Sequence, residues 1–355
     1  MERYNDIGML DLIPRPAFCA AEGRVTRVNT QAAALNISPG MMVAELLATG
    51  EEEYAAFEGG CLHLTITAAM QTFRVSVTRL EDFDVFRVDE DADSRDLQVM
   101  ALAARELRSP LDAITNTVRK LFPVAGLRDD PATHTQVGQL NRGLFQMLRV
   151  IGNMSDAAQP ATSPRMELVD IPSLLDEIFA TAATFVEHTQ RTLTYQGYPE
   201  SVHGLADRER LERAVMNMVS NAIKFSGDGD TIRASLTKRG RKFYLTVEDS
   251  GSGISAGIRG DVFTRYQRGC AIEDTRFGIG LGMVLIRAAA AAHGGTVLVK
   301  SNRDGGTKIT MSLAIRQGSA QVRSHVLSVD YTGGLDSRLI ELSECLPENL
   351  YEKEL

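Results

Sequence analysis

The sequence is poor in several features that would each point to a particular class of protein. It has only four cysteines, scattered at Cys19, Cys61, Cys270 and Cys345. Because this spacing fits neither a disulfide framework nor a zinc site, we expect four single thiols in a reducing cytosol. A run of about 18 consecutive apolar residues is also missing, so no membrane-spanning helix is expected.

Two further absences concern charge. The chain has no basic excess, and its net charge of −8 argues against nucleic acid as the main partner, because nucleic-acid-binding surfaces are usually basic. The first residues, 1–6, lack the basic and apolar regions of a signal peptide, so a cytoplasmic location is expected. The remaining composition, with 44% hydrophobic and 24% charged residues in 355 positions, indicates a protein of two or three ordinary domains.

Three fragments between residues 217 and 282 carry most of the functional signal. They read Asn217-Met-Val-Ser-Asn221-Ala-Ile-Lys224, Asp249-Ser-Gly251-Ser-Gly253-Ile254 and Gly278-Ile-Gly280-Leu281-Gly282. In the first, the two asparagines and the lysine are separated by four and three residues, so they share one face of a helix. An amide oxygen can bind Mg²⁺ beside a phosphate without adding charge, and a lysine can meet phosphate as a point charge. This fragment therefore fits a polyphosphate site.

The other two fragments fit the remainder of a nucleotide. Asp249 ends an alternating run that is typical of a strand, where its carboxylate could accept a hydrogen bond from an adenine amino group. Gly251 and Gly253 would let the backbone turn tightly beside the base. The last fragment precedes the alanine-rich run 283–292, which predicts a flexible loop and a helix N-terminus facing phosphate. A generic α/β domain with glycine-rich loops is the alternative interpretation.

In this order, the fragments resemble the N, G1 and G2 boxes of the ATP-binding module of sensor histidine kinases. That module belongs to a superfamily that also includes gyrase, a heat-shock chaperone family and MutL. The stretch Val262-Phe263-Thr-Arg-Tyr-Gln-Arg268 matches the F box between them. The resemblance implies bound ATP and Mg²⁺, with Asn221 as the metal ligand. The nucleotide-binding residues that it implies are Asn217, Asn221, Lys224, Asp249, Gly251, Gly253, Ile254, Phe263, Arg268, Gly278, Gly280, Leu281 and Gly282.

Residues 97–158 carry two seven-residue apolar repeats separated by a break rich in glycine, aspartate and proline. Two helices joined by a loop form an antiparallel hairpin, and two hairpins form a four-helix bundle. Because one hairpin has too narrow a core, we expect a homodimer, as in the dimerisation domain of the same kinases; a dimeric spacer without chemistry is the alternative. The repeats comprise Leu97, Met100, Ala104, Leu107, Leu111, Ile114, Val118 and Leu121, then Val137, Leu140, Leu144, Met147, Ile151, Met154 and Ala158.

The first of these helices departs from the family's pattern at one residue. Sensor histidine kinases carry a phosphoacceptor box, His-Glu-Leu-Arg-Thr/Ser-Pro-Leu, and this chain has Arg105 in place of the histidine. An arginine stays protonated and cannot be the phosphorylated nucleophile. Glu106 is retained without its histidine, and Ser109 stands where the family often has a threonine that helps to dephosphorylate a response regulator. We therefore expect no phosphohistidine at this site.

The N-terminal residues are predicted to form a small PAS-like sensor. A hairpin turning at Glu22-Gly23, a short helix near residues 31–35 and three later strand-like runs indicate this order. His63 alternates opposite the apolar face of its strand, which predicts a solvated histidine rather than a haem ligand. His293 follows the alanine-rich run and is interpreted as a helix cap rather than a base.

The tail after residue 316 exceeds what the ATP-binding module needs. Leu335, Leu339, Ile340, Leu342 and Leu346 approximate a short amphipathic helix. Such a helix docks on the chain's own module or on a partner, with disorder as the alternative.

The predicted fold class is multidomain α+β. It comprises a PAS-like α/β sensor (1–90), a two-helix dimerisation hairpin (91–160), an α/β sandwich ATP-binding domain of the histidine kinase, heat-shock chaperone and gyrase type (161–316), and a tail (317–355). One function is a sensor histidine kinase acting with a response regulator. Another is an ATP-gated scaffold that binds a partner or a partner kinase. A serine kinase of the anti-sigma-factor type is the third, and the long helical hairpin argues against it.

Overall fold

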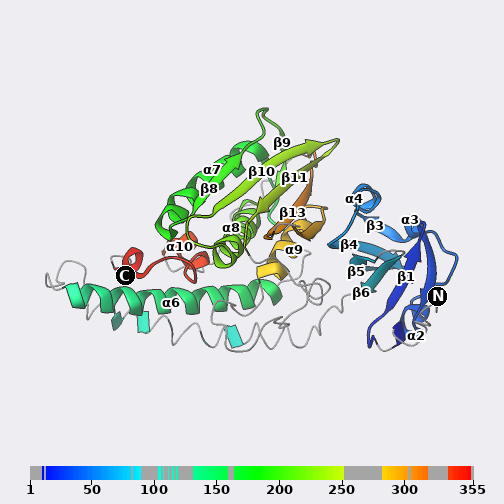
Figure 1. Ribbon diagram of the computed structural model, residues 1–355, viewed down its shortest axis with the longest axis horizontal. Coiled ribbons are helices and arrows are strands. Elements are labelled where there is room, and N and C mark those ends of the chain that lie inside the picture. The colour runs from blue at the N-terminus through cyan, green and yellow to red at the C-terminus, as the bar shows by residue number, and fades with distance from the viewer. Residues whose placement is uncertain are drawn as a thin grey trace.

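The computed structural model describes residues 10–11, 13–80, 83–88, 131–158, 164–251, 282–302, 305–318 and 335–352, with eight separate helical positions between 103 and 118. Figure 1 shows a small sheet at the N-terminal end, the long helix α6 (Pro131–Ala158) along one side, and a sheet covered by helices above α6. We call this last part, residues 164–318, the α/β unit. Within the described ranges no helix is both long enough and apolar enough to cross a membrane.

The N-terminal strands form an antiparallel sheet in the order β2-β1-β6-β5-β4. The expected hairpin is present, as are the three later strands and the helix α2, which Asn29 caps. The short elements α3, β3 and α4 were missed by sequence reasoning, because three to five residues carry too little periodicity to detect. The bounds are β1 (Ala17–Ala21), β2 (Arg24–Val28), α2 (Thr30–Ala34), α3 (Val43–Leu46), β3 (Leu47–Thr49), α4 (Glu51–Ala55), β4 (Cys61–Ala68), β5 (Gln71–Arg79) and β6 (Asp84–Val88).

The α/β unit contains a mixed sheet in the order β12-β13-β11-β10-β8, in which only the β8–β10 pair is parallel. Three helices pack on this sheet, and β7 and β9 form a separate two-stranded sheet. The sequence also predicts a helix over residues 171–186, and α7 has these bounds, whereas β9 and β10 were not predicted. The bounds are β7 (Glu167–Asp170), α7 (Ile171–Val186), β8 (Thr192–Gln196), β9 (His203–Ala206), α8 (Arg208–Phe225), β10 (Thr231–Arg239), β11 (Lys242–Glu248), α9 (Gly282–Ala292), β12 (Val297–Ser301) and β13 (Thr307–Ala314).

The two sheets are joined, because β4 pairs with β12 and an eleven-stranded sheet results. An ion pair between Lys242 and Glu53, at 2.8 Å, lies across the same junction. The prediction for His63 is wrong: this side chain is 3% exposed. Its face of β4, shared with Cys61, belongs to the core of the α/β unit instead of facing water. Burial, with Arg287 and Arg74 nearby, lowers the pKa of His63 well below its ordinary value.

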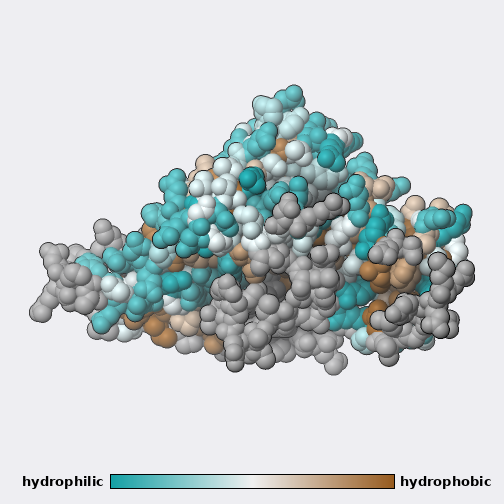
Figure 2. Space-filling view, in the orientation of Figure 1, coloured by the Kyte–Doolittle hydropathy of each residue, from teal (hydrophilic) through white to brown (hydrophobic). Residues whose placement is uncertain are grey.

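The helical repeats divide into two sets, each spaced by seven residues. One set is packed within the chain and is 7% exposed or less: Ala104, Leu111, Val118, Val137, Leu144 and Ile151. The other set is 41–50% exposed: Leu107, Ile114, Leu140 and Met147. Figure 2 shows apolar side chains along the lower edge of the molecule, where α6 lies. Among the described repeat residues, six are therefore buried within the single chain and four are left exposed, while Leu97, Met100 and Leu121 lie outside the described residues.

The C-terminal tail docks on its own chain. It contains α10 (Ser337–Glu341) and the short 3₁₀ turn η4 (Glu348–Tyr351). In Figure 1 the tail lies between α6 and the α/β unit, and its elements contact α6 and α8. Of the three outcomes left open by the sequence, docking on the chain itself is the one observed for residues 335–352.

Candidate functional site

The helix α8 carries the first of the three fragments and is positioned by its own ends and apolar face. Asp207 caps its start, accepting a hydrogen bond of 3.1 Å from the backbone N–H of Arg210. An apolar stripe then fixes its rotation over the sheet. The buried members of this stripe are Leu211, Val215, Met218 and Ala222.

The polar residues of α8 lie at the positions that the spacing predicted. Asn217 is fully buried, and its amide donates to the Arg213 carbonyl over 2.9 Å. Asn221 and Lys224 are half-buried. The Asn221 amide nitrogen lies 3.6 Å from the sulfur of Met283, in the first turn of α9. The helix thus presents its two amides toward the start of α9, whereas the Lys224 ammonium group pairs with Glu344 of the tail.

Asp249 follows β11 and is 6% exposed. Its Oδ1 accepts hydrogen bonds of 3.0 Å from the backbone N–H groups of Gly251 and Thr307. Burial raises the pKa of this carboxyl above its ordinary value, although the two N–H groups oppose the shift. The carboxylate is therefore held in one orientation through Oδ1, and the hydrogen bonds of the described residues leave Oδ2 for a further donor.

Both glycine fragments converge on α8. A Cβ on Gly251 would overlap the carbonyl of Phe225, the last residue of α8. A Cβ on Gly282, which begins α9, would lie 2.9 Å from Oδ1 of Asn217. Only residues without a side chain permit these approaches. The described parts of the second and third fragments, which are separated in the sequence, therefore lie against the helix that carries the first.

Several predicted residues lie outside the described ranges. They are Gly253, Ile254, Phe263, Arg268, Gly278, Gly280 and Leu281 of the nucleotide site, and Arg105, Glu106 and Ser109 of the phosphoacceptor box. Their assignments stay predictions from the sequence.

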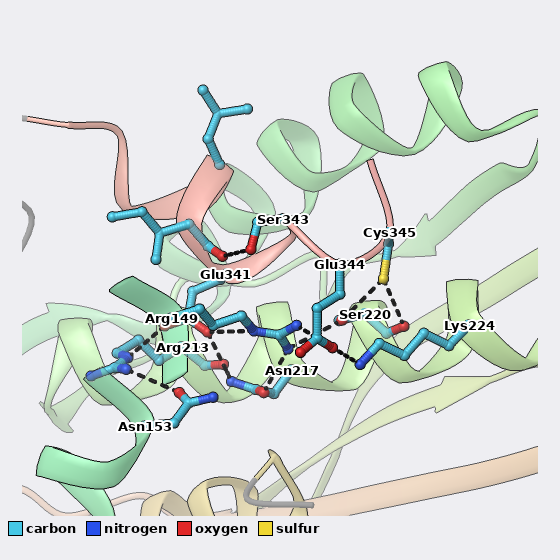
Figure 3. A network of polar contacts seen from close by, with 12 residues as sticks. Arg149, Asn153, Arg213, Asn217, Ser220, Lys224, Glu341, Ser343, Glu344 and Cys345 are labelled. Carbon is cyan, nitrogen blue, oxygen red and sulfur yellow. Dashed lines mark hydrogen bonds and ion pairs between the residues drawn. The ribbon is translucent and has the colours of Figure 1, made fainter. Parts of the chain in front are cut away.

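A polar network beside α8 was missed by sequence reasoning (Figure 3). Arg149 of α6 is 4% exposed and donates to Oδ1 of Asn217 over 3.3 Å. Two tail carboxylates, Glu341 and Glu344, join the same network. Burial raises the pKa of the Glu344 carboxyl, but Arg149 and Lys224 outweigh it and hold that pKa below its ordinary value.

The sequence does contain a signal for this network. Arg142 and Arg149 are seven residues apart on α6, so they share one face of that helix, and Glu341 and Glu344 are three residues apart at and just after the end of α10. Arg142 donates to the Ser343 carbonyl over 3.1 Å, which places both arginines against the tail. Matching these two charged pairs across 190 residues needs the tertiary structure.

His293 joins the end of α9 to the start of α8. The backbone N–H of Asp207 donates to its Nε2 over 3.0 Å, and its Nδ1 lies 2.7 Å from the Ala289 carbonyl. Because Nε2 accepts, the ring is neutral, with its proton on Nδ1. Burial lowers the pKa of His293, which favours this neutral form. Both nitrogens are engaged by backbone groups, so the residue is a structural bridge rather than a base.

Mg²⁺ was expected with the nucleotide, and the donors present can be compared with its preferences. Among the described residues no group of three His, Cys, Asp or Glu side chains could hold a metal by itself. An amide oxygen such as that of Asn221 suits a hard cation that keeps phosphate and water in its shell. The Asn221 amide oxygen would thus be compatible with an ion brought in by a polyphosphate.

Comparisons with known proteins agree with this geometry. A family model described as "Histidine kinase-, DNA gyrase B-, and HSP90-like ATPase" matches residues 206–317. The sensor-like histidine kinase SenX3 of Mycolicibacterium smegmatis is 27% identical over 245 residues, which cover 65% of this chain and 62% of the relative. A sensor-like histidine kinase of Rhizobium meliloti is 27% identical over 234 residues, covering 63% of this chain and 44% of the relative. The chain thus spans less than two thirds of the length of these relatives.

A solved structure gives the same indication about the fold. Full-length ShkA in complex with AMPPNP superposes with a TM-score of 0.51 at 20% identity, covering 69% of this chain and 54% of that chain. The matched ATPase segment contains α8, β11 and α9, the elements around which the three fragments meet. Residues 206–317 therefore match the ATPase family shared by histidine kinases, DNA gyrase B and HSP90, and the chain is similar to sensor histidine kinases over about two thirds of its length.

Proposed function

We propose that this chain binds Mg²⁺-ATP in the α/β unit and acts as a sensor histidine kinase-like signalling protein without a phosphohistidine at position 105. The observation that carries the proposal is the convergence of Gly251 and Gly282 on α8. In this arrangement Oδ2 of Asp249 receives the adenine amino group. The polar face of α8 meets the phosphates, where charge neutralisation and positioning are the protein's main contributions.

The Mg²⁺ dependence of binding tests this proposal. We expect Asn221→Ala to weaken ATP binding about tenfold in Mg²⁺, since an interaction with a charged group is worth about 1.5–3 kcal/mol. In EDTA the same change should have little effect, because no metal is present to lose a ligand. Isothermal titration calorimetry of both proteins in both buffers measures the difference. A wild-type protein that binds no nucleotide in either buffer would rule out the proposed function.

The proposal also assigns a function to the residues on either side of the ATP-binding domain. The antiparallel order β2-β1-β6-β5-β4 supports a PAS-like sensor in residues 1–90, and its junction with β12 offers a route to the α/β unit. We assign residues 91–160 to dimerisation, 161–316 to ATP binding and 317–355 to the tail, in a cytoplasmic protein. The conformation of the chain then depends on the bound nucleotide, and a response regulator or a partner kinase recognises this conformation.

A second candidate function is a regulatory scaffold that does not transfer phosphate. The observation that favours it is Arg105, which offers only protonated donors in place of an imidazole. In that case Ser109 retains the alternative role of positioning water for dephosphorylation of a response regulator.

We also propose that two copies of this chain pair through the exposed heptad set. Leu107, Ile114, Leu140 and Met147 leave an apolar stripe, spaced by seven residues on each helix, uncovered in the single chain. A second hairpin with the same stripe would bury it and complete a four-helix bundle.

Substitution of the exposed set separates dimerisation from folding. We expect Leu140→Asp to give a folded monomer, because this residue is 41% exposed in the single chain and a charge there affects only the partner contact. Leu168→Asp is the matched control, as Leu168 is 49% exposed on β7, outside the helical repeats. Leu144→Asp, at a 3% exposed site, should instead give insoluble protein. Light scattering that finds a wild-type monomer would show that the assignment is wrong.

A further inference from the structure

The C-terminal tail, residues 335–352, is anchored as a folded segment between α6 and α8. The ring of Tyr351 meets Phe145 of α6 edge-on, with centroids 5.1 Å apart, and its hydroxyl donates to the Leu339 carbonyl. The Asn141 amide donates to the Tyr351 carbonyl over 2.7 Å. The tail is thus held in register along α6. Its buried apolar anchors are Leu339, Ile340, Leu342, Leu346 and Tyr351.

This register directs two tail carboxylates at the polar face of α8 (Figure 3). Glu344 forms ion pairs with Lys224 and, over 2.8 Å, with Arg149. Glu341 pairs with Arg213 over 2.8 Å and accepts a hydrogen bond of 3.3 Å from the Asn217 amide. Asn217 and Lys224 are the residues to which the proposed function assigns the phosphates. The tail therefore presents anionic oxygens to the groups that a bound triphosphate needs.

If the tail leaves, other anions must take the place of its two carboxylates, because the network is rich in positive charge. Three cations, Arg149, Arg213 and Lys224, surround two carboxylates, and Arg149 is only 4% exposed. Removing the carboxylates would take from the buried Arg149 the two counterions that the structure shows, which is strongly destabilising. A triphosphate supplies several anionic oxygens, and charged hydrogen bonds from arginine and lysine suit phosphate as well as carboxylate.

We propose that the tail is an internal competitor of the nucleotide: Glu341 and Glu344 occupy the phosphate subsite, and ATP binds when the tail leaves. Arg149 and Arg213 then become phosphate-binding residues supplied from outside the three sequence fragments. This inference rests on the proposed ATP binding. Because the tail also bridges α6 and α8, its departure removes a contact between the helical region and the ATPase domain.

Neutralising the two carboxylates tests the competition directly. We expect Glu341→Gln with Glu344→Gln to bind the analogue AMPPNP about tenfold more tightly than wild type, as a tail docked nine-tenths of the time reduces the apparent affinity by that factor. Glu348→Gln with Glu352→Gln is the matched control. These carboxylates of the same tail pair with Arg142 and His134 of α6, at 3.7 and 3.9 Å, away from the polar face of α8. The control should bind as wild type does, because such partly exposed pairs contribute little.

Cys345 provides a readout of tail position that does not depend on affinity. Its sulfur lies 3.2 Å from the Ser220 hydroxyl, so departure of the tail exposes the thiol. We expect AMPPNP to accelerate alkylation of Cys345 by iodoacetamide in wild type, as followed by peptide mass spectrometry. The Glu341→Gln, Glu344→Gln protein should react quickly even without nucleotide. Cys61, which is fully buried, is the internal control and should stay slow.

The two measurements distinguish failure of this inference from failure of ATP binding. Equal AMPPNP affinities in wild type and the neutralised variant, or saturation of wild type without faster alkylation of Cys345, would show that tail and nucleotide coexist. Absence of AMPPNP binding in both proteins, while Cys345 of the variant reacts quickly, would overturn the proposed ATP site itself and the competition with it.

Discussion

Asp249→Asn is expected to reduce ATP affinity by about 1–3 kcal/mol, the usual effect of leaving a buried donor unpaired. The change preserves the structural role of the residue, because the Asn side-chain oxygen can still accept from the backbone N–H groups of Gly251 and Thr307. It replaces the other carboxylate oxygen by an NH₂ group. That group cannot accept a hydrogen bond from the adenine amino group, so two donors would face each other.

The same substitution makes a prediction about base selectivity. Guanine carries a carbonyl oxygen where adenine carries its amino group, and the new NH₂ group can donate to it. We therefore expect the ratio of GTP to ATP affinity to rise in Asp249→Asn, as measured by calorimetry with each nucleotide. Asp228→Asn is the control, since this side chain is 73% exposed and pairs only with Arg191 on the surface. Unchanged ATP affinity in Asp249→Asn would show that the base binds elsewhere.

Arg105→His is expected to convert an unlabelled protein into one labelled by γ-labelled ATP. Autophosphorylation of this box needs an imidazole nitrogen that is neutral and nucleophilic near pH 7, with the retained Glu106 beside it. Wild type offers only a protonated guanidinium at this position. The label on the variant should be acid-labile and alkali-stable, as expected for phosphohistidine.

Two controls connect such labelling to the proposed site. Arg108→His places an imidazole in the same box at a position without the acceptor role, and it should remain unlabelled. Adding Asp249→Asn to Arg105→His should reduce labelling in proportion to its loss of ATP affinity. Acid-labile, alkali-stable phosphate on wild type would contradict the prediction, because another histidine would then be the acceptor.

The spacing of residues in the sequence was sufficient to predict structure where the environment of a residue depends on a single helix or strand. The spacing of residues predicted a helix over the bounds of α7 and the shared face of Asn217, Asn221 and Lys224 on α8, because both depend on neighbours within one helix. The glycines of the G1 and G2 fragments were also recognisable, since close backbone approach excludes other residue types. Gly251 and Gly282 do meet α8 as such approaches require.

Other features were decided by contacts between segments far apart in the sequence. The alternation around His63 predicted a solvated face, but pairing of β4 with β12 places that face in the core of the α/β unit. The heptads predicted one seam, and only packing within the chain shows that Leu144 is covered and Leu140 is not. Periodicity reports that a face is apolar; it does not report which surface covers it.

The sequence by itself determined the family resemblance, the three nucleotide-site fragments, the helical repeats and the replacement of histidine by Arg105. The tertiary structure decided that the tail returns to α8 and that Glu341 and Glu344 meet Arg149, Arg213 and Lys224. The physical reason is the range of the interactions. Helix faces and tight turns depend on neighbours three to seven residues away. Pairing of buried charges across about 190 residues depends on which surfaces the folded chain brings together, and no local pattern specifies that.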